Sequence, residues 1–538
     1  MSSTARALSD RFARMQERLR DPEWRRYGYL LIFGKALGLA CLFGMIFLLS
    51  SLLGDPAGAA DAPPVLTGND VVNPLNTVWT LVAAFLVFGM QVGFTMLEAG
   101  FCRSRETVNV LMECIVDTCL CGLLFFAIGF AFMFSEGNGW IGYHYFFLQD
   151  APATYGTTGI AFLAFWVFQF AFADTCSTIT SGAMIGRTAF VGDLLYSVAV
   201  SGFIYPIIGH WAWGPDGFLA TMGSEGTFLP SLGMSFHDFA GSTVVHTIGG
   251  FIALAGAIVL GPRLGRRFKR DGGGPMLPHD LTIAACGGLL LWFGWYGFNP
   301  GSTLSALDFE GIGRVAANTT LAACAAGLSA MTVAYLTISR GKWDVSFTVN
   351  GFLAGLVAIT CPCYWVSPVG AVVLGGVAGG VVVMGVELLE WLRIDDPIGA
   401  VPVHGFCGIW GTLSLGLFAC GRFGATGPLG PDHAAPLTGL FYGGGFQVLK
   451  AQFIGSLMVT VATFGVAMTV MALVNAMGKL RISEEGELYG LDLHEHGIPA
   501  YPEYVISSMG RPAGLTVDSS VQPLVHPMRQ PTLGEARS

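Results

Sequence analysis

The chain has 538 residues, of which 53% are hydrophobic and 12% are charged, and its mean hydropathy is +0.61. Soluble domains carry about 25% charged residues, so this composition excludes an ordinary cytosolic enzyme, a disordered regulator and a nucleic-acid-binding protein. The net charge of −9 is spread over polar ends and loops, without a basic stripe suited to a phosphate backbone. The sequence therefore predicts an all-α membrane protein that lies in a lipid bilayer.

The N-terminal segment 1–60 is distinct from the rest. Residues 1–28 carry seven Arg, an apolar run covers 30–53, and the small residues of 57–60 follow. This order is typical either of a signal peptide, cleaved after 60, or of an uncleaved signal anchor that adds an extra N-terminal hydrophobic segment.

Eleven further apolar runs are long enough to cross a bilayer, which takes ~20 residues. They lie near 77–101, 109–134, 156–184, 189–210, 239–261, 281–299, 313–338, 346–364, 369–391, 398–420 and 450–478. We therefore expect a transmembrane domain of eleven helices over 61–480, a polar C-terminal segment over 481–504 and a flexible tail over 505–538, which is rich in Pro.

Basic residues mark alternate loops between these runs. They are Arg103 and Arg105; Arg187; the stretch 263–270; Arg340 and Lys342; Arg393; and Lys479 and Arg481. The intervening loops are mainly acidic. The positive-inside rule places the basic loops in the cytoplasm, so we expect a multi-pass protein of the cell (plasma or inner) membrane, with the mature N-terminus outside and the C-terminus in the cytoplasm.

Two segments of the chain match each other in spacing. Asp238 precedes His246 by eight positions, Asp396 precedes His404 by eight, and a Gly follows each His by four. These segments begin the fifth and tenth crossings. Because five is odd, the two halves run through the membrane in opposite directions, which predicts a 5+5 inverted repeat plus a final helix.

The same spacing predicts where the two His lie. An Asp at each helix start can cap it, and eight residues of α-helix place each His about 12 Å into a core about 30 Å thick. His246 and His404 then meet near the midplane. A paired pore lining is favoured, because ionisable groups at that depth are costly; structural hydrogen bonding and metal binding remain alternatives, although no third metal ligand is placed comparably.

Aromatic residues gather near the outer ends of several runs, including Phe172, Trp213, Trp295 and Phe298, with Ser302 following. Aromatic faces attract a small cation, and a hydroxyl oxygen can accept its N–H. Aromatic belts at the membrane interface give the same pattern, so spacing alone leaves both interpretations open.

The chain resembles ammonium transporters of the Amt family, within the Amt/Rh superfamily, from about residue 75 to 502. The matching motifs lie at 90–100, 238–246, 291–299, 351–360, 395–408 and 490–501. Three positions depart from the family pattern: Asp174 replaces a small neutral residue, Gly186 replaces a Glu that would be an acidic partner for Arg187, and Cys361-Pro-Cys363 replaces Pro-Ala. We expect Asp174 either to hydrogen-bond within 175–181 or to alter the electrostatics of the site.

The resemblance implies roles for residues along one pathway. These are an outer substrate-binding site of Trp213, Phe172 and Ser302; a gate of Phe172 and Phe298; a pore and proton relay of His246, His404 and Trp295; and supporting positions at Asp238 and Thr360. It implies no catalytic residue, cofactor or metal.

The implied function is nitrogen uptake. Ammonium would bind at the outer site and lose a proton, and ammonia would pass a twin-histidine pore with coupled proton transfer, which makes uptake electrogenic. The alternatives are an electroneutral ammonia gas channel, an ammonium sensor that signals through partner proteins, and, least favoured, an intramembrane metalloenzyme using His246 and His404. The family also implies a homotrimer with one pore per subunit, a segment 481–504 that contacts the neighbouring subunit, and a PII-type regulator at the cytoplasmic face.

Overall fold

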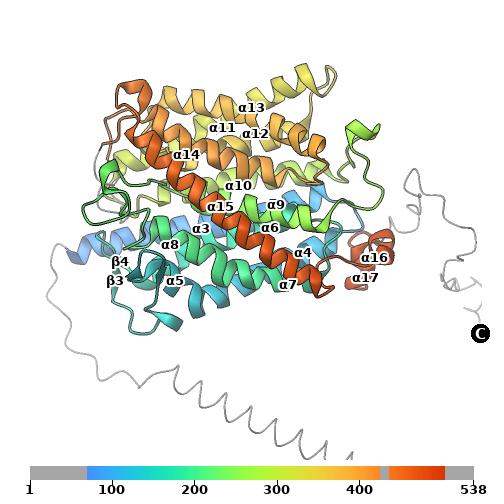
Figure 1. Ribbon diagram of the computed structural model, residues 1–538, viewed down its shortest axis with the longest axis horizontal. Coiled ribbons are helices and arrows are strands. Elements are labelled where there is room, and N and C mark those ends of the chain that lie inside the picture. Colours follow the sequence, from blue (N-terminus) through green and yellow to red (C-terminus); the bar gives the residue numbers. More distant parts are fainter. Residues whose placement is uncertain (1–68, 425–435, 503–538) are drawn as a thin grey trace, which may run out of the picture. The chain divides into compact units, whose positions relative to one another are not determined.

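The computed structural model describes residues 69–424 and 436–502 (Figure 1). Within them, ten helices are long and apolar enough to cross a membrane, and an eleventh apolar helix, Val345–Thr360, is shorter. The prediction of an all-α membrane protein is thus confirmed, and the shorter helix corresponds to the predicted run near 346–364. The predicted signal segment 1–60 and tail 505–538 lie outside the described residues.

The membrane helices follow the order of the predicted runs. They are α3 (Asn69–Phe101); α4 (Thr107–Leu124), η1 (Phe125–Gly129) and α5 (Phe130–Phe134); α6 (Phe162–Gly182); α7 (Phe190–Ala199), η3 (Val200–Ile204) and α8 (Tyr205–Trp213); η5 (Ser242–Thr247) and α9 (Ile248–Leu260); α10 (Leu281–Gly301); α11 (Phe309–Thr337); α12 (Val345–Thr360); α13 (Pro368–Leu392); η7 (Val401–Phe406) and α14 (Cys407–Phe418); and α15 (Gln447–Ala476). In Figure 1, α15 crosses the face of the helix bundle obliquely.

Short elements fill the loops at the two ends of the bundle. They are β1 (Gly137–Asn138), β2 (Ile141–Gly142), η2 (Phe146–Leu148), β3 (Thr154–Tyr155), β4 (Ile160–Ala161), η4 (Pro230–Leu232), η6 (Lys269–Asp271), η8 (Leu440–Tyr442), α16 (Glu484–Tyr489) and α17 (Leu491–Glu495). Strands β1 and β2 pair antiparallel, as do β3 and β4.

Several predicted helix boundaries were wrong, and α3 begins at Asn69 rather than near 77. The run near 156–184 begins with the turn and second strand of a ribbon, because Gly156 and Gly159 adopt positive φ between β3 and β4. The run near 346–364 stops being helical at Thr360, two residues before Pro362, a residue that cannot continue helical hydrogen bonding.

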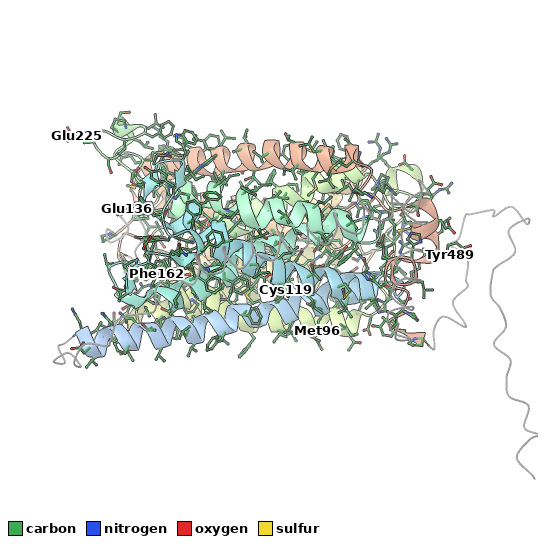
Figure 2. All side chains as sticks on the ribbon, turned by 90° about the horizontal axis from the view of Figure 1, so that it is seen from below. Met96, Cys119, Glu136, Phe162, Glu225 and Tyr489 are labelled. Atoms are coloured by element: carbon green, nitrogen blue, oxygen red, sulfur yellow. The ribbon has the colours of Figure 1, made fainter. Side chains whose placement is uncertain are left out.

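The basic loops gather at one end of the bundle. Figure 2 places Glu136 and Glu225 at the end opposite Tyr489 of the C-terminal segment. At the Tyr489 end, Arg105 donates to the Leu488 carbonyl at 2.8 Å, and Arg263 contacts the Asp395 carboxylate through Nε at 2.8 Å and Nη2 at 2.9 Å. Burial alone would raise the pKa of Asp395, but the Arg263 guanidinium holds it well below its usual range. The predicted basic loops thus lie at the Tyr489 end of the bundle, where their side chains are packed and ion-paired.

Glycines let the two halves of the repeat approach closely. A Cβ on Gly250 of α9 would lie 2.3 Å from the Gly405 nitrogen in η7, and one on Gly408 of α14 would lie 2.5 Å from the Ser242 carbonyl in η5. Small residues permit such backbone contact between membrane helices. The Gly four positions beyond each His is therefore a packing requirement of the crossing.

We expect Gly250→Ala to destabilise the protein by about 1–3 kcal/mol, because the added methyl meets backbone that cannot move away as a side chain could. The matched control is Gly380→Ala in α13, where nothing lies within 4 Å of the added Cβ. The measurement is the thermal unfolding midpoint of the purified protein in detergent. Equal midpoints for the two variants would show that the close crossing is not needed.

Candidate functional site

Both His-bearing helices begin at an Asp that caps them. The Asp238 carboxylate accepts hydrogen bonds from the N–H groups of residues 241–244 at 2.8–2.9 Å. The Asp396 carboxylate accepts three from residues 399–401 at 2.8–3.1 Å. Such caps satisfy helix-start donors that have no intrahelical partner. The caps expected from the spacing are present in both halves.

The turns that follow are wider than the expected α-helix. Both His lie in π-helical segments, η5 and η7, and the residues before these segments include Gly241 at φ 114° and Gly399 at φ 80°. A π-helical turn departs from α-helical spacing and recurs at functional sites. The assumed rise of 1.5 Å per residue therefore does not hold in these turns, although the two imidazoles still meet.

The imidazole rings of His246 and His404 lie against each other inside the bundle. Their Nδ1 atoms are 3.1 Å apart and their ring centroids 5.2 Å apart. His246 is 0% exposed and His404 is 6% exposed. Since each neutral ring carries one N–H, one Nδ1 donates and the other accepts. The Nε2 atom of His246 is buried and has no hydrogen-bond partner among the described residues.

Aromatic rings form the walls around this pair. Trp295 stacks on His246 with a centroid distance of 5.1 Å, and Phe298 lies 5.4 Å from the same ring. The Trp295 indole N–H donates to the Thr360 hydroxyl at 2.9 Å, which fixes the ring. Phe94 of α3 lies 6.2 Å from His404. Thr360 thus orients the Trp295 ring that packs against His246.

Next to the pair, the predicted outer aromatic residues come together, and Ser302 lies one helical turn beyond Phe298. Phe172 and Phe298 stack with centroids 4.0 Å apart, and Trp213 lies 6.1 Å from Phe172 in an edge-on orientation. The Ser302 hydroxyl donates to the Phe298 carbonyl at 2.8 Å, so the lone pairs of its oxygen remain able to accept. Aromatic rings and a hydroxyl acceptor suit a small cation with N–H groups.

Asp238 is connected through its backbone to the cluster of Trp213, Phe172, Phe298 and Ser302, which we call the mouth. Its carbonyl accepts the Trp213 indole N–H at 2.8 Å, while its carboxylate caps η5. Burial raises the pKa of the Asp238 carboxyl to about 6, although the four backbone donors oppose the shift, so the group is ionised at neutral pH. It orients Trp213 and the His246 helix rather than facing a ligand itself.

Two departures from the family pattern have structural explanations. Asp174 accepts a hydrogen bond from Thr118 of α4 at 3.2 Å, so the bond expected within 175–181 is made across helices instead. At Gly186, an added Cβ would lie 2.7 Å from the Glu106 carboxylate, so the Glu106 side chain occupies the space that a side chain at 186 would need.

The C-terminal segment packs against the helical domain of the same chain. Asp492 of α17 accepts the Asn109 N–H at 3.0 Å, and the Arg481 guanidinium contacts Glu487 of α16 at 2.8 Å. The His496 ring lies 3.0 Å from the Asn109 side-chain oxygen. The two contacts with Asn109 tie the segment to the start of α4, and the Arg481–Glu487 pair is internal to the segment.

Sequence reasoning missed several residues that shape the site. Phe94 is separated from His404 by more than 300 positions and shares no spacing pattern with it. Thr243 and Thr412 form a buried hydrogen bond between η5 and α14, and the Ser242 hydroxyl donates to the Val357 carbonyl at 2.7 Å. No local signal distinguishes these hydroxyls from other Thr and Ser in apolar runs.

We expect Asp238→Asn to destabilise the protein by about 1–3 kcal/mol, because one carboxylate oxygen serves Gly241 and Ser242 and the other serves Thr243 and Val244. An amide nitrogen cannot accept the second pair. In the control Asp280→Asn, a single oxygen already accepts both helix-start donors, at 2.9 and 3.0 Å, so the carbonyl oxygen of Asn preserves them. A thermal midpoint that falls equally in both variants would contradict this role of Asp238.

Comparison with known proteins places this geometry in a family. Residues 78–501 match the model of the Ammonium Transporter Family. Ammonium transporter Amt2 of Archaeoglobus fulgidus is 41% identical over 486 residues, which cover 89% of this chain and 98% of that protein. Ammonium transporter 1 member 1 of Arabidopsis thaliana is 39% identical over 420 residues, 76% of this chain and 81% of that protein.

Solved structures agree. A structure titled "Sensor Amt Protein" has a TM-score of 0.70 at 34% identity and covers 80% of this chain and 100% of its own. Candida albicans Mep2 has a TM-score of 0.69 at 28% identity over 81% of this chain and 92% of its own. Both likenesses span the helical domain. The chain therefore belongs to the ammonium transporter family, a family of membrane transporters rather than enzymes.

Proposed function

We propose that this ammonium transporter moves its substrate as neutral ammonia through the passage lined by His246 and His404, while the proton crosses separately along the two imidazoles. Transport is then electrogenic uptake. The observation that carries the proposal is the 3.1 Å contact between the two Nδ1 atoms inside a fully buried aromatic enclosure.

Recruitment begins at the outer mouth. Ammonium is about the size of water or potassium, so pore width alone does not select it. Trp213 and Phe172 offer electron-rich ring faces, and the Ser302 oxygen accepts an N–H that potassium lacks. The stacked pair Phe172 and Phe298, 4.0 Å apart, closes the passage below, so the substrate reaches the His only when these rings move.

The dry pore makes the ion lose its proton. Carrying an unpaired charge into a low-dielectric interior costs several kcal/mol even after relaxation. Ammonium avoids this cost by giving up a proton at the gate and passing as ammonia. Potassium cannot lose its charge in this way and is rejected.

The His pair offers the proton its own route. A proton first binds to Nε2 of His246. The proton on Nδ1 of His246 then moves to Nδ1 of His404. His404 finally releases the proton from its own Nε2. Each transfer exchanges the tautomers of the two rings. The unpartnered, buried Nε2 of His246 is suited to receive that first proton.

The proposal extends to the setting of the protein. The ion-paired basic end faces the cytoplasm of the cell (plasma or inner) membrane by the positive-inside rule, with the mature N-terminus outside. The transmembrane domain covers 61–480 and the regulatory segment 481–504. The family implies a homotrimer, coupled through that segment, with a PII-type regulator at the cytoplasmic face.

Two other functions remain as rivals. An electroneutral gas channel would use the same pore without the proton route. An ammonium sensor acting through partner proteins is supported by the similarity to the structure titled "Sensor Amt Protein". A large ammonium-evoked flux in proteoliposomes favours transport over a sensor with little flux of its own.

We expect His404→Asn and His246→Asp each to lower the ammonium-evoked current by about ten- to a hundredfold, because neither new side chain has the second ring nitrogen through which the proposed route passes a proton. His246→Asp should also admit potassium, since a carboxylate in the pore lowers the barrier for a cation. Solid-supported-membrane electrophysiology on proteoliposomes, with ammonium and potassium pulses, measures both effects.

The matched control is His144→Asn, which changes an exposed His in an outer loop and should leave both responses unchanged. Either pore variant keeping full ammonium current together with full potassium rejection would refute the proton route.

We expect Ser302→Ala to raise the ammonium concentration needed for half-maximal current by about three- to tenfold, with little change in maximal current. It removes one uncharged acceptor, worth about 0.5–1.5 kcal/mol, at the mouth and leaves the His pair intact. A concentration series on the same proteoliposomes measures the shift, and an unchanged half-maximal concentration would exclude Ser302 from recruitment.

A further inference from the structure

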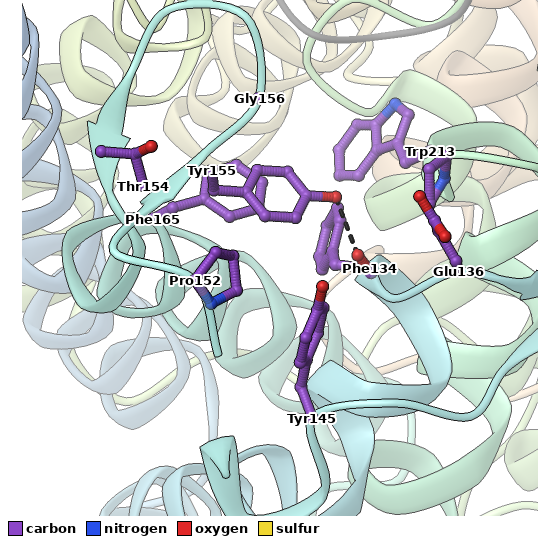
Figure 3. A pocket seen from close by; sticks show the side chains of 10 residues that line it. Phe134, Glu136, Tyr145, Pro152, Thr154, Tyr155, Gly156, Phe165 and Trp213 are labelled. Atoms are coloured by element: carbon purple, nitrogen blue, oxygen red, sulfur yellow. Dashed lines mark hydrogen bonds between the residues drawn. The ribbon is translucent and has the colours of Figure 1, made fainter. Parts of the chain in front are cut away.

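A second pocket opens at the outer end of the bundle, beside the mouth. Its volume is about 240 Å³. Figure 3 shows residues from α5, the loop that follows it, β3, α6 and α8 around one space. The lining residues that bear on its chemistry are Phe134, Glu136, Tyr145, Tyr155, Phe165 and Trp213.

The aromatic side of the pocket is held in place. Tyr155 stacks on Phe165 with centroids 4.2 Å apart and planes 8° apart, and Phe134 meets Phe165 edge-on at 5.1 Å. The Tyr155 hydroxyl donates to the Phe134 carbonyl at 2.8 Å. In Figure 3, the hydroxyl ends of Tyr155 and Tyr145 and the carboxylate of Glu136 face the same space, with Trp213 behind them.

The pocket has a negative electrostatic environment. No Lys or Arg occurs between Arg105 and Arg187, or between Arg187 and Arg263, so neither outer loop beside the pocket carries a basic side chain. The exposed Glu136 carboxylate forms no ion pair or hydrogen bond with any described residue. Burial raises the pKa of the Tyr155 phenol, and the negative charges of the Asp216 and Glu136 carboxylates add to the shift. The space favours a positive charge.

Its size favours an organic cation over ammonium alone. A water molecule, which ammonium resembles in size, occupies about 30 Å³ in the liquid, far less than the 240 Å³ available. Ammonium would remain hydrated there and would contact few of the lining side chains directly. An amine carrying several methyl groups contacts several aromatic rings at once, and rings with a nearby carboxylate are the arrangement that recognises alkylated ammonium groups.

We propose that this pocket binds a small organic ammonium cation, with Glu136 as its counter-charge and the aromatic rings of Phe134, Tyr145 and Tyr155 around its alkyl groups. Because Trp213 belongs both to this pocket and to the mouth, an occupant competes with ammonium for entry. Binding does not depend on the proposed transport function, whereas the competition rests on it.

Binding is tested by isothermal titration calorimetry of the purified full-length protein with tetramethylammonium as the probe. We expect saturable binding to the unmodified protein, at least about tenfold weaker binding to Glu136→Gln and Tyr145→Leu, and no binding of uncharged tert-butanol. The control Glu225→Gln removes another exposed carboxylate at the same end of the bundle (Figure 2) and should change nothing. Absence of saturable binding, equal affinity in Glu136→Gln, or equal binding of tert-butanol would overturn the proposal.

Competition is tested on proteoliposomes. Tetramethylammonium should raise the ammonium concentration for half-maximal current without lowering the maximum, and Glu136→Gln should abolish this effect. Ser302→Ala separates the two hypotheses, because it should weaken the response to ammonium while leaving tetramethylammonium binding intact. Binding without inhibition would overturn the shared role of Trp213; absence of any ammonium current would refute the transport mechanism and leave the binding result standing.

Discussion

The free-energy cost of placing an unpaired cation among buried aromatic rings is the constraint on which the arrangement around His246 and His404 depends. His246 and His404 meet where the surrounding walls are aromatic and the nearest cap, Asp238, is directed at backbone N–H groups. The side chains that stack around the two imidazoles in the described part of the chain are uncharged aromatic rings, so a cation there would face no counter-charge on these walls, while an uncharged molecule meets only rings and one unpartnered ring nitrogen. The proposed selection by proton loss rests on that enclosure, because size separates ammonium poorly from other monovalent ions.

The contact between the rings depends on both halves of the inverted repeat. Each half supplies an Asp that fixes a helix start, a π-helical turn that presents an imidazole, and a Gly that lets the opposite backbone approach. Gly250 meets η7 and Gly408 meets η5, so each half positions the other's His. These two close crossings hold the halves in one position, and they keep a 3.1 Å contact between residues 158 positions apart. A change in either crossing would move the two rings relative to each other.

Much of this arrangement could be predicted from spacing, and the limits are physical. Hydropathy located the crossings because each must bury about 20 apolar residues, and the repeated Asp-to-His interval indicated a meeting of the two His near the midplane. The interval did not reveal the π-helical turns, whose geometry depends on packing across the repeat. Phe94 beside His404, the Thr118 donor to Asp174, and the Glu106 side chain filling the space at Gly186 are contacts between distant helices. The turn at Gly156 and Gly159 and the second strand of the ribbon, β4, were hidden within an apolar run.

The ratio of charge to substrate tests most directly whether ammonium is divided into ammonia and a separately conducted proton. Unmodified protein in proteoliposomes is held at a fixed membrane potential, and the integrated current is compared with the uptake of isotope-labelled ammonium in the same vesicles. One positive charge for each ammonium taken up, with no current from potassium, is the predicted result. Uptake of label with no accompanying charge would contradict it and identify a neutral gas pore.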